Sequence, residues 1–324
     1  MHIMINAILN FPKQFGFAPK ILNKANFKRR KKFIVLGMGG SHLAADILLS
    51  YNPALPIIIR SDYGLPQADE KELAKTLIIA SSYSGNTEEV IDGLQAALAK
   101  NLNVAVTAVG GKLIDIAKEK NLPYVQLPDT GIQPRSALGY SIMALLKVMN
   151  VKEGLKEAKA LKKILNPKAS EQAGRELASR LKNFVPVIYA SARNRAVAYN
   201  WKIKFNETGK IPSFYNVVPE LNHNEMTGLD VKDATKKLSD TLYFIFLKDS
   251  ADDARVQKRM DILKTLYQDR GLPVEVIEMS GASVMAKIFS SLVLADWAAT
   301  YTAEQYGLDP EQVPMVEEFK KQMQ

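Results

Sequence analysis

The sequence predicts an α/β protein of two domains, each with a parallel sheet flanked by helices. Short apolar runs that end in glycine or polar turns alternate with stretches of helical period, a pattern typical of parallel sheets covered on both faces. The alternation occurs in two blocks of similar size, and 324 residues exceed what one hydrophobic core usually contains. With 47% apolar and 24% charged residues, the composition is that of an ordinary globular protein.

The first block opens with Phe33–Gly37, an apolar strand that a glycine-rich turn connects to a helix at 43–49. Further strands are expected at 56–60, 77–80, 104–107 and 124–127. Helices are expected at 88–100 and after the glycine pair at 110–111. The residues before the first strand are expected to form helices that lie against this body.

Between residues 151 and 180 the apolar period becomes helical and rich in lysine, and Asn166-Pro167 interrupts it. We therefore divide the chain into residues 1–155, a domain with a leading helical segment, and residues 156–324, a domain with C-terminal helices. In the second domain, strands are expected at 185–189, 242–247 and 273–277, and helices at 194–206, 252–269 and 284–306.

Composition and patterning exclude several classes of protein. No apolar run approaches the ~18–20 residues that a membrane span requires. The first residues lack the charged, apolar and small-residue regions of an export signal, so we expect a cytoplasmic protein without a membrane partner. The chain has no cysteine, which excludes disulfides, thiolate metal sites and cysteine nucleophiles.

The net charge of +9 raises the question of nucleic acid binding. The only dense basic cluster, Lys28-Arg-Arg-Lys-Lys32, directly precedes the first apolar run. No aromatic residues interleave with basic ones, as a surface that stacks bases would require. We interpret the cluster as a solvated approach to the first strand and expect no nucleic acid partner.

The segment Ser81-Ser-Tyr-Ser-Gly-Asn-Thr87 follows an apolar strand and opens a helix. A helix N-terminus offers free backbone N–H groups and the positive end of a dipole, which together favour phosphate. Ser82, Ser84 and Thr87 add hydroxyls, and Gly85 allows the backbone to approach closely. Helix capping explains one hydroxyl but not this set at the carboxyl end of a strand, where ligands bind in such sheets. The segment therefore predicts a phosphate site.

Two other turns are candidates for the same site. The turn at 37–41 is similar to a dinucleotide fingerprint, but His42 stands where that fingerprint needs glycine, so we expect no nucleotide cofactor. Gly40 and Ser41 are expected to form a second wall of the phosphate pocket instead. Arg135 follows a later strand and could pair with a surface carboxylate, but its place at the sheet edge favours contact with an anion.

With three histidines and no cysteine, the acid–base candidates are few. His2 is terminal, and His42 opens a helix, where capping or packing is the simpler interpretation. His223 lies in a polar loop rich in hydrogen-bonding groups, so we expect a functional role for it. Glu207 ends a predicted helix and, taken alone, could be a surface residue paired with Lys204 or Lys210.

Taken together, these segments resemble the bifunctional phosphoglucose/phosphomannose isomerases, a branch of the sugar isomerase (SIS) superfamily. The matching segments occur in the family's order and extend over about the whole chain: Gly37-Met-Gly-Gly-Ser41, Ser82-Tyr-Ser-Gly-Asn-Thr87, Pro134-Arg-Ser-Ala-Leu-Gly139, Asn206-Glu-Thr-Gly-Lys210 and Glu220-Leu-Asn-His-Asn-Glu225. The resemblance implies two SIS domains, each a three-layer αβα sandwich. It also implies a homodimer whose active site lies between domains, with a contribution from the partner subunit.

The resemblance further implies the roles of the site residues. Phosphate binding falls to Ser82, Ser84 and Thr87, helped by Gly40 and Ser41. Arg135 would stabilise an enediolate, Glu207 would carry the proton between C1 and C2, and His223 of the partner subunit would open the sugar ring. No metal is expected, because three scattered histidines do not supply a ligand cluster.

Two positions near the C-terminus bear on the resemblance. The family uses a lysine very near the end of the chain, and Lys320 fits its position better than Lys321. The family often has threonine before the proline ahead of the last helix, linked to acceptance of mannose 6-phosphate. This chain has Val313 there, which leaves the relative activity on glucose and mannose substrates open.

Other functions are compatible with part of the pattern. An isomerase of an aminosugar or pentulose phosphate would share the serine-rich loop, but the segments around Glu207 and His223 argue against it. A non-catalytic SIS protein that senses a sugar phosphate would also share the loop. Such a regulator usually carries a DNA-binding helical domain, and no helix-turn-helix pattern stands out in the first residues.

Overall fold

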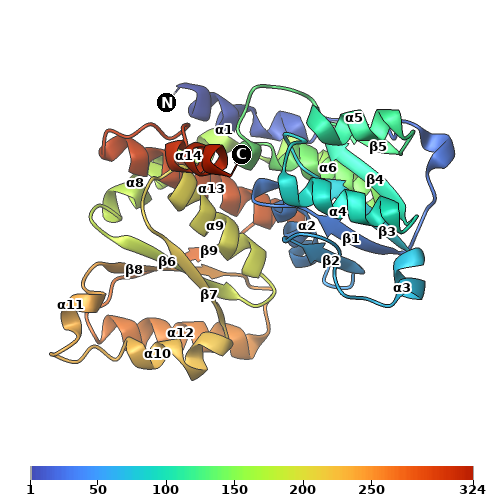
Figure 1. Ribbon diagram of the computed structural model, residues 1–324. Coiled ribbons are helices and arrows are strands. Elements are labelled where there is room, and N and C mark those ends of the chain that lie inside the picture. The colour runs from blue at the N-terminus through green and yellow to red at the C-terminus, as the bar shows by residue number, and fades with distance from the viewer. Residues whose placement is uncertain (1, 324) are drawn as a thin grey trace. The chain divides into compact units, whose positions relative to one another are not determined.

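The computed structural model describes residues 2–323, which form two compact units, each built around a parallel sheet (Figure 1). One unit consists of residues 10–165, and the other of residues 166–323 together with residues 2–9. The boundary expected after residue 155 falls inside helix α7 (Lys152–Ile164), and the units divide at Asn166, where the sequence breaks. Helix α7 belongs to the first unit because it packs there closely: a Cβ on Gly154 would lie 2.8 Å from a methyl group of Leu146.

The sheet of the first unit has the strand order β2-β1-β3-β4-β5, with all pairs parallel. Its strands confirm those expected from the alternation: β1 (Lys32–Leu36), β2 (Ile57–Arg60), β3 (Thr76–Ser81), β4 (Asn103–Ala108) and β5 (Tyr124–Gln126). The chain passes from β1 to β2 on one side of the sheet, then crosses back to β3 on the other side of β1 and continues to β4. The carboxyl ends of β1 and β3 therefore form the topological switch point, where ligands bind in sheets of this order.

Helices cover both faces of this sheet, as the alternation predicts. They are α1 (His2–Gln14, which begins in the other unit), α2 (Gly40–Tyr51), α3 (Glu70–Ala74), α4 (Glu88–Ala99), α5 (Gly111–Glu119), α6 (Leu138–Val148) and α7, with the 3-10 turns η1 (Lys24–Asn26) and η2 (Pro134–Ser136). Alternate residues of β1, β3 and β4 form one core with α4 and α5. The sequence does not predict α6, because nearly all of its residues are buried and it therefore lacks a polar face.

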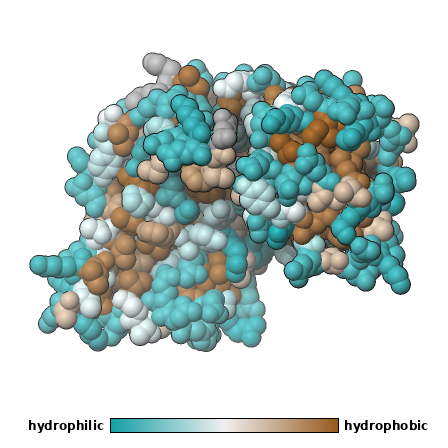
Figure 2. All heavy atoms as spheres, in the orientation of Figure 1, coloured by the Kyte–Doolittle hydropathy of each residue, from teal (hydrophilic) through white to brown (hydrophobic). Residues whose placement is uncertain are grey.

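The sheet of the second unit has the order β7-β6-β8-β9, again with all pairs parallel. Its strands are β6 (Val185–Ser191), β7 (Phe214–Val218), β8 (Leu242–Lys248) and β9 (Val274–Glu278). The sequence does not predict β7, an edge strand whose Asn216 interrupts a short apolar run. Figure 2 shows apolar residues gathered over β6 and β7 on the visible face of this unit, and Phe214 is 60% exposed.

The helices of the second unit include the long α13 (Val284–Gln305), most of which is buried. The others are α8 (Glu171–Arg180), α9 (Arg195–Glu207), α10 (Glu225–Gly228), α11 (Lys236–Ser239), α12 (Ala254–Gln268) and α14 (Pro314–Gln322), with the 3-10 turns η3 (Pro167–Ser170) and η4 (Glu220–His223). Gly174 of α8 lies against Trp297 of α13, where a Cβ would come within 2.3 Å of the tryptophan side chain. Among residues 2–323, no helix combines the length and apolar character that a membrane span needs.

Candidate active site

Ser82 is the centre of a hydroxyl cluster at the start of α4. Its Oγ lies 2.7 Å from Thr87 Oγ1 and 3.5 Å from Ser84 Oγ. It also accepts a hydrogen bond from the backbone N–H of Gly85, at 3.1 Å. Thr87 occupies the N-cap position of α4 but makes no capping hydrogen bond through its side chain. Helix capping therefore does not account for the three hydroxyls, which converge as a phosphate site requires.

Glycines hold this loop in a shape that other residues would disrupt. Gly85 has a φ of +77°, and a Cβ there would lie 1.8 Å from the carbonyl oxygen of Gly110. A Cβ on Gly111 would lie 2.6 Å from Asn86 Oδ1, which accepts a hydrogen bond from the backbone N–H of Lys112 at 3.0 Å. The turn after β4 thus supports the loop that contains Ser82 and Thr87. This supporting role was not predicted from the sequence, although the glycine pair after a strand was a signal for it.

The turn after β1 forms the second wall of the hydroxyl cluster. Ser41 is buried in the first turn of α2, and its Oγ accepts a hydrogen bond from the backbone N–H of Tyr83 at 2.9 Å. This bond joins the loops that follow β1 and β3. Gly40 packs closely against η2, because it lacks a side chain: a Cβ would lie 3.1 Å from the carbonyl carbon of Pro134 and 3.3 Å from the backbone nitrogen of Arg135. The first unit therefore brings together all the phosphate-site residues expected from the sequence.

Arg135 adds a positive charge to this edge of the first sheet. Arg135 lies in η2 and is only 7% exposed, so its side chain is buried. A guanidinium stays charged at all physiological pH values, and burying it is costly unless it meets hydrogen-bond acceptors or negative charge. A cation held at the same edge as the hydroxyl cluster suits an anionic ligand.

The equivalent place in the second sheet, between the carboxyl ends of β6 and β8, carries buried carboxylates instead. Asp249 lies 2.8 Å from the ammonium of Lys287, and Asn194 Nδ2 lies 3.4 Å from both Asp249 and Asp252. Burial acts to raise the pKa of Asp249, but hydrogen bonds from Lys287 and from the backbone of Ala251 outweigh it and lower that pKa. Burial raises the pKa of Asp252. These negative groups would repel a phosphate, so the phosphate geometry belongs to the first sheet.

Glu207 is the last residue of α9 and is half-buried. Of the two lysines considered as its surface partners, Lys204 is buried and forms an ion pair with Asp296. Lys210 donates a hydrogen bond to the backbone carbonyl of Glu207 and another to that of Gln312. The turn that contains Glu207 is therefore fixed to the segment that leads into α14.

His223 is the last residue of η4, and its side chain is exposed. The segment around it is anchored on both sides. Leu221 is fully buried, and the carboxylate of Glu225 accepts hydrogen bonds from the Tyr189 hydroxyl and the Asn216 amide. Burial raises the pKa of Tyr189 well above its ordinary value, so its hydroxyl stays protonated and can donate. The structure thus presents an exposed imidazole on a fixed turn.

Glu207 and His223 lie at opposite edges of the second sheet. Helix α9 follows β6 and returns to the amino edge of the sheet, where Ser213 Oγ donates to the carbonyl oxygen of Pro186, at 2.9 Å. Strand β7 then runs from Phe214 to Val218, and η4 with His223 follows its carboxyl end. A strand of this length spans roughly 15 Å. The second unit of one chain therefore does not bring these two residues together.

Lys320 lies on the exposed helix α14, where its ammonium is 2.8 Å from Glu317. An exposed ion pair between residues three apart on a helix is an ordinary surface feature and contributes little to stability. These surroundings do not assign Lys320 to a site, and its role stays a prediction. His42 lies 2.5 Å from Asp46, one turn further along α2, in keeping with its interpretation as a helix residue.

Comparisons with known proteins agree with this architecture. The model for the bacterial phospho-glucose isomerase C-terminal SIS domain matches residues 170–323. The sequence is 32% identical over 341 residues to the bifunctional phosphoglucose/phosphomannose isomerase of Caldicellulosiruptor bescii, with 99% of this chain and 98% of the relative covered. It is 31% identical to the enzyme of the same name from Aquifex aeolicus, with 90% of each chain covered.

Solved structures show the same fold at lower sequence identity. A hypothetical protein from Thermus thermophilus aligns with a TM-score of 0.70 and 16% identity, covering 98% of this chain and 89% of that one. Glucosamine-6-phosphate deaminase from Thermotoga maritima aligns with a TM-score of 0.68 and 16% identity, covering 96% and 97%. The two sheets and the hydroxyl-lined switch point define a two-domain SIS protein. Within that class, the chain belongs to the bifunctional phosphoglucose/phosphomannose isomerase family, which confirms the resemblance found in the sequence.

Proposed function

We propose that this protein interconverts glucose 6-phosphate and fructose 6-phosphate, with mannose 6-phosphate as a second substrate. The observation that carries the proposal is the convergence of the Ser82, Ser84 and Thr87 hydroxyls at the switch point of the first sheet. Family membership supports the choice of hexose 6-phosphates over other phosphorylated sugars. The proposal includes a cytoplasmic location, where phosphorylated sugars are made and used.

In this mechanism the phosphate is held by the hydroxyl cluster and by the backbone N–H groups that begin α4. The free N–H groups of a helix N-terminus and its positive dipole end both favour a dianion. Ser41 acts mainly by positioning, because its Oγ already accepts the backbone N–H of Tyr83. Gly40 lets η2 approach, which places Arg135 at the same edge.

The chemistry falls to Arg135, Glu207 and His223. His223 exchanges protons with the ring oxygen and the anomeric hydroxyl, which opens the sugar. Glu207 then removes the proton from C2 of the aldose and returns it to C1, by way of a cis-enediolate, while the hydroxyl proton of O2 passes to O1. The Arg135 guanidinium stabilises the negative charge that develops on the enediolate oxygens. Each proton that leaves the substrate returns to it, so the reaction needs no cofactor, and we propose that it needs no metal.

We propose that the protein acts as a homodimer in which His223 serves the partner subunit. The separation of Glu207 and His223 by the length of β7 supports this assignment, because one chain's second unit holds them apart. Edge strand β7 carries the exposed Phe214, and apolar residues gather over β6 and β7 (Figure 2), as a surface that meets another subunit would. Lys320 is assigned to the site on the resemblance alone.

A coupled assay with fructose 6-phosphate and with mannose 6-phosphate, each in the presence of a chelator, tests the function. We expect turnover of both sugars by the wild-type protein and a loss of about a thousandfold or more in kcat for Glu207→Gln, the upper range for general acid–base catalysis. Glu176→Gln, on the exposed face of α8, is the matched control and should be fully active. A wild-type protein that binds both sugar phosphates without converting either would instead support a non-catalytic sensor.

A further inference from the structure

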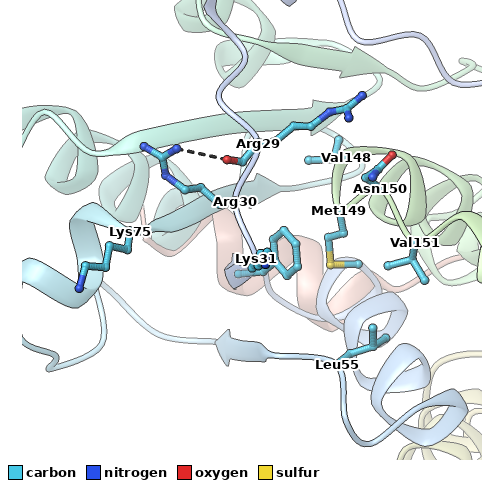
Figure 3. Close-up of a pocket in the computed structure, with 10 residues that line it drawn as sticks. Arg29, Arg30, Lys31, Leu55, Lys75, Val148, Met149, Asn150 and Val151 are labelled. Carbon is cyan, nitrogen blue, oxygen red and sulfur yellow. Dashed lines mark hydrogen bonds between the residues drawn. The ribbon is translucent and has the colours of Figure 1, made fainter.

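A basic cavity lies in the first unit, at the amino edge of the sheet, opposite the loop that contains Ser82 and Thr87. Its volume is about 650 Å³, within the range of small-molecule sites. It is lined by Arg29, Arg30, Lys31, Phe33, Leu55, Lys75, Val148, Met149, Asn150 and Val151 (Figure 3). The cluster at 28–32, interpreted from the sequence as a solvated approach to β1, thus contributes three of its residues to the wall of a cavity.

The charge of this cavity is of one sign. Arg29, Arg30, Lys31 and Lys75 line it, and no acidic residue is among the lining residues. Lys32, the last residue of the cluster, is paired with Glu72, and Glu72 also lies 3.7 Å from Lys75. Such a concentration of positive charge in a concave surface attracts anions and raises their local concentration.

The guanidinium of Arg30 is incompletely satisfied. One of its terminal nitrogens donates to the backbone carbonyl of Arg29 at 3.2 Å. Its Nε is buried and has no hydrogen-bond partner among the described residues. A buried donor without a partner is costly, and an acceptor supplied by a ligand would remove that cost. Arg30 is thus both a charge and an open hydrogen-bond donor in this cavity.

The rest of the cavity wall is largely apolar. Phe33, Leu55, Val148, Met149 and Val151 contribute to it. Val151 is also the N-cap residue of α7, a helix of 13 residues, and makes no side-chain capping bond, so the positive end of that helix adds to the field. A cavity with an apolar wall and several cations fits a molecule with both apolar and anionic parts, better than it fits a bare inorganic ion.

The cations are also spread out. In Figure 3 the guanidinium groups of Arg29 and Arg30 point to opposite sides of the segment that leads into β1, and Lys75 comes from the segment before β3. A single phosphate could meet only part of this set. We propose that the cavity binds an organic polyphosphate, of the size and chemistry of a nucleoside triphosphate, with its apolar part against the half-buried Leu55 and Val151 and its phosphates toward the arginines and lysines.

Calorimetric titration with ATP tests this site, with saturating fructose 6-phosphate present to occupy the catalytic phosphate loop. We expect ATP to bind the wild-type protein at one site per chain, and adenosine and inorganic phosphate to bind at least about tenfold more weakly, since each offers only part of the contacts. The double variant Arg29→Gln/Arg30→Gln should weaken ATP binding about tenfold or more, because it removes charged hydrogen-bond donors. The control Lys118→Gln/Lys120→Gln removes the same charge from the exposed end of α5 and should bind as the wild type does.

The proposal is wrong if ATP does not bind at millimolar concentration, if fructose 6-phosphate displaces ATP, or if the control variant loses as much affinity as the arginine variant. Inorganic phosphate binding as tightly as ATP would also contradict it, because the apolar wall would then be unused. If the arginine variant fails to fold, the exposed Lys75→Glu decides, since it reverses a charge of the cavity on the surface and should also weaken ATP binding at least about tenfold. If Lys75→Glu binds ATP as tightly as the wild type does, the proposed site is wrong.

Discussion

Ser82 Oγ and Thr87 Oγ1 lie 2.7 Å apart at the carboxyl edge of the first sheet and hydrogen-bond to each other. A phosphate placed there would accept from both hydroxyls in place of this mutual bond. The pair is pre-organised, because the backbone N–H of Gly85 fixes Ser82 and the N-cap position fixes Thr87. The loop can therefore bind phosphate with little loss of conformational freedom.

The first prediction concerns this pair. Ser82→Ala and Thr87→Val should each raise KM for fructose 6-phosphate about tenfold to a hundredfold, the effect of one hydrogen bond to a charged group. The phosphate contact is the same before and during the reaction, so kcat should fall much less. Steady-state kinetics separate the two constants. Ser179→Ala, on the exposed face of α8, is the control, and an unchanged KM in both loop variants would remove phosphate binding from this cluster.

Gly85 allows a second prediction, because a matched glycine exists in the same unit. Gly85→Ala should abolish phosphate binding and lower the free energy of unfolding by about 2 kcal/mol or more, since φ is +77° and a Cβ would lie 1.8 Å from the Gly110 oxygen. Gly64 has a φ of +68° with open space around a Cβ, so Gly64→Ala should cost only about 1 kcal/mol. Denaturant unfolding measures both, and equal losses would mean that the close approach to Gly110 is unimportant.

The two buried carboxylates beside the second sheet, Asp249 and Asp252, should affect the free energy of unfolding in opposite directions. Asp249 has a lowered pKa, so it stabilises the fold above its unfolded pKa of about 3.9, and this contribution is lost as the pH falls through the folded value. Asp252 has a raised pKa, so its ionisation destabilises the fold as the pH rises above about 3.9. At pH 7, Asp249→Asn should therefore lower the free energy of unfolding and Asp252→Asn should raise it. Unfolding curves at pH 7 and pH 3 measure these changes in the free energy of unfolding, and both changes should be smaller at pH 3. If both variants change the free energy of unfolding in the same direction at pH 7, the opposite pKa shifts of Asp249 and Asp252 are contradicted.

Substrate choice gives a further prediction at Val313. Its neighbour Gln312 accepts a hydrogen bond from Lys210, which also binds the carbonyl of Glu207, so this segment lies beside the proposed base. Val313→Thr should raise the ratio of mannose to glucose 6-phosphate activity about fivefold to tenfold, the effect of one added hydrogen bond. The same exchange at Val316, further along α14, should leave the ratio unchanged. An unchanged ratio in Val313→Thr would mean that this position does not determine the choice between mannose and glucose 6-phosphate.

The sequence was sufficient to predict most of the fold because each strand in both sheets is followed by a turn and most helices are amphipathic. It failed at α6, whose buried residues leave no polar face, and at β7, a short edge strand interrupted by Asn216. The convergence of Ser41 with the hydroxyls of Ser82 and Thr87 was predictable because these residues lie in loops that follow neighbouring parallel strands, and such loops meet at one edge. The same reasoning could not place Glu207 relative to His223, because the strand between them was not recognised.

The position of β7 leads to the last prediction, which separates action within one chain from action between chains. If His223 serves the partner subunit, a mixed dimer of Glu207→Gln and His223→Ala has one site with both residues intact and one with neither. Random reassociation of equal amounts should therefore restore about a quarter of the wild-type activity, although each variant alone is inactive. Co-refolding followed by the coupled assay measures this, with native mass spectrometry to count mixed dimers. Mixing Glu207→Gln with Glu207→Gln/His223→Ala supplies the control, because no mixed dimer then contains Glu207, and activity should stay absent. If mixed dimers form in the first mixture but no activity returns, each chain supplies both residues to its own site. The second unit would then have to rearrange around β7 to bring Glu207 and His223 together.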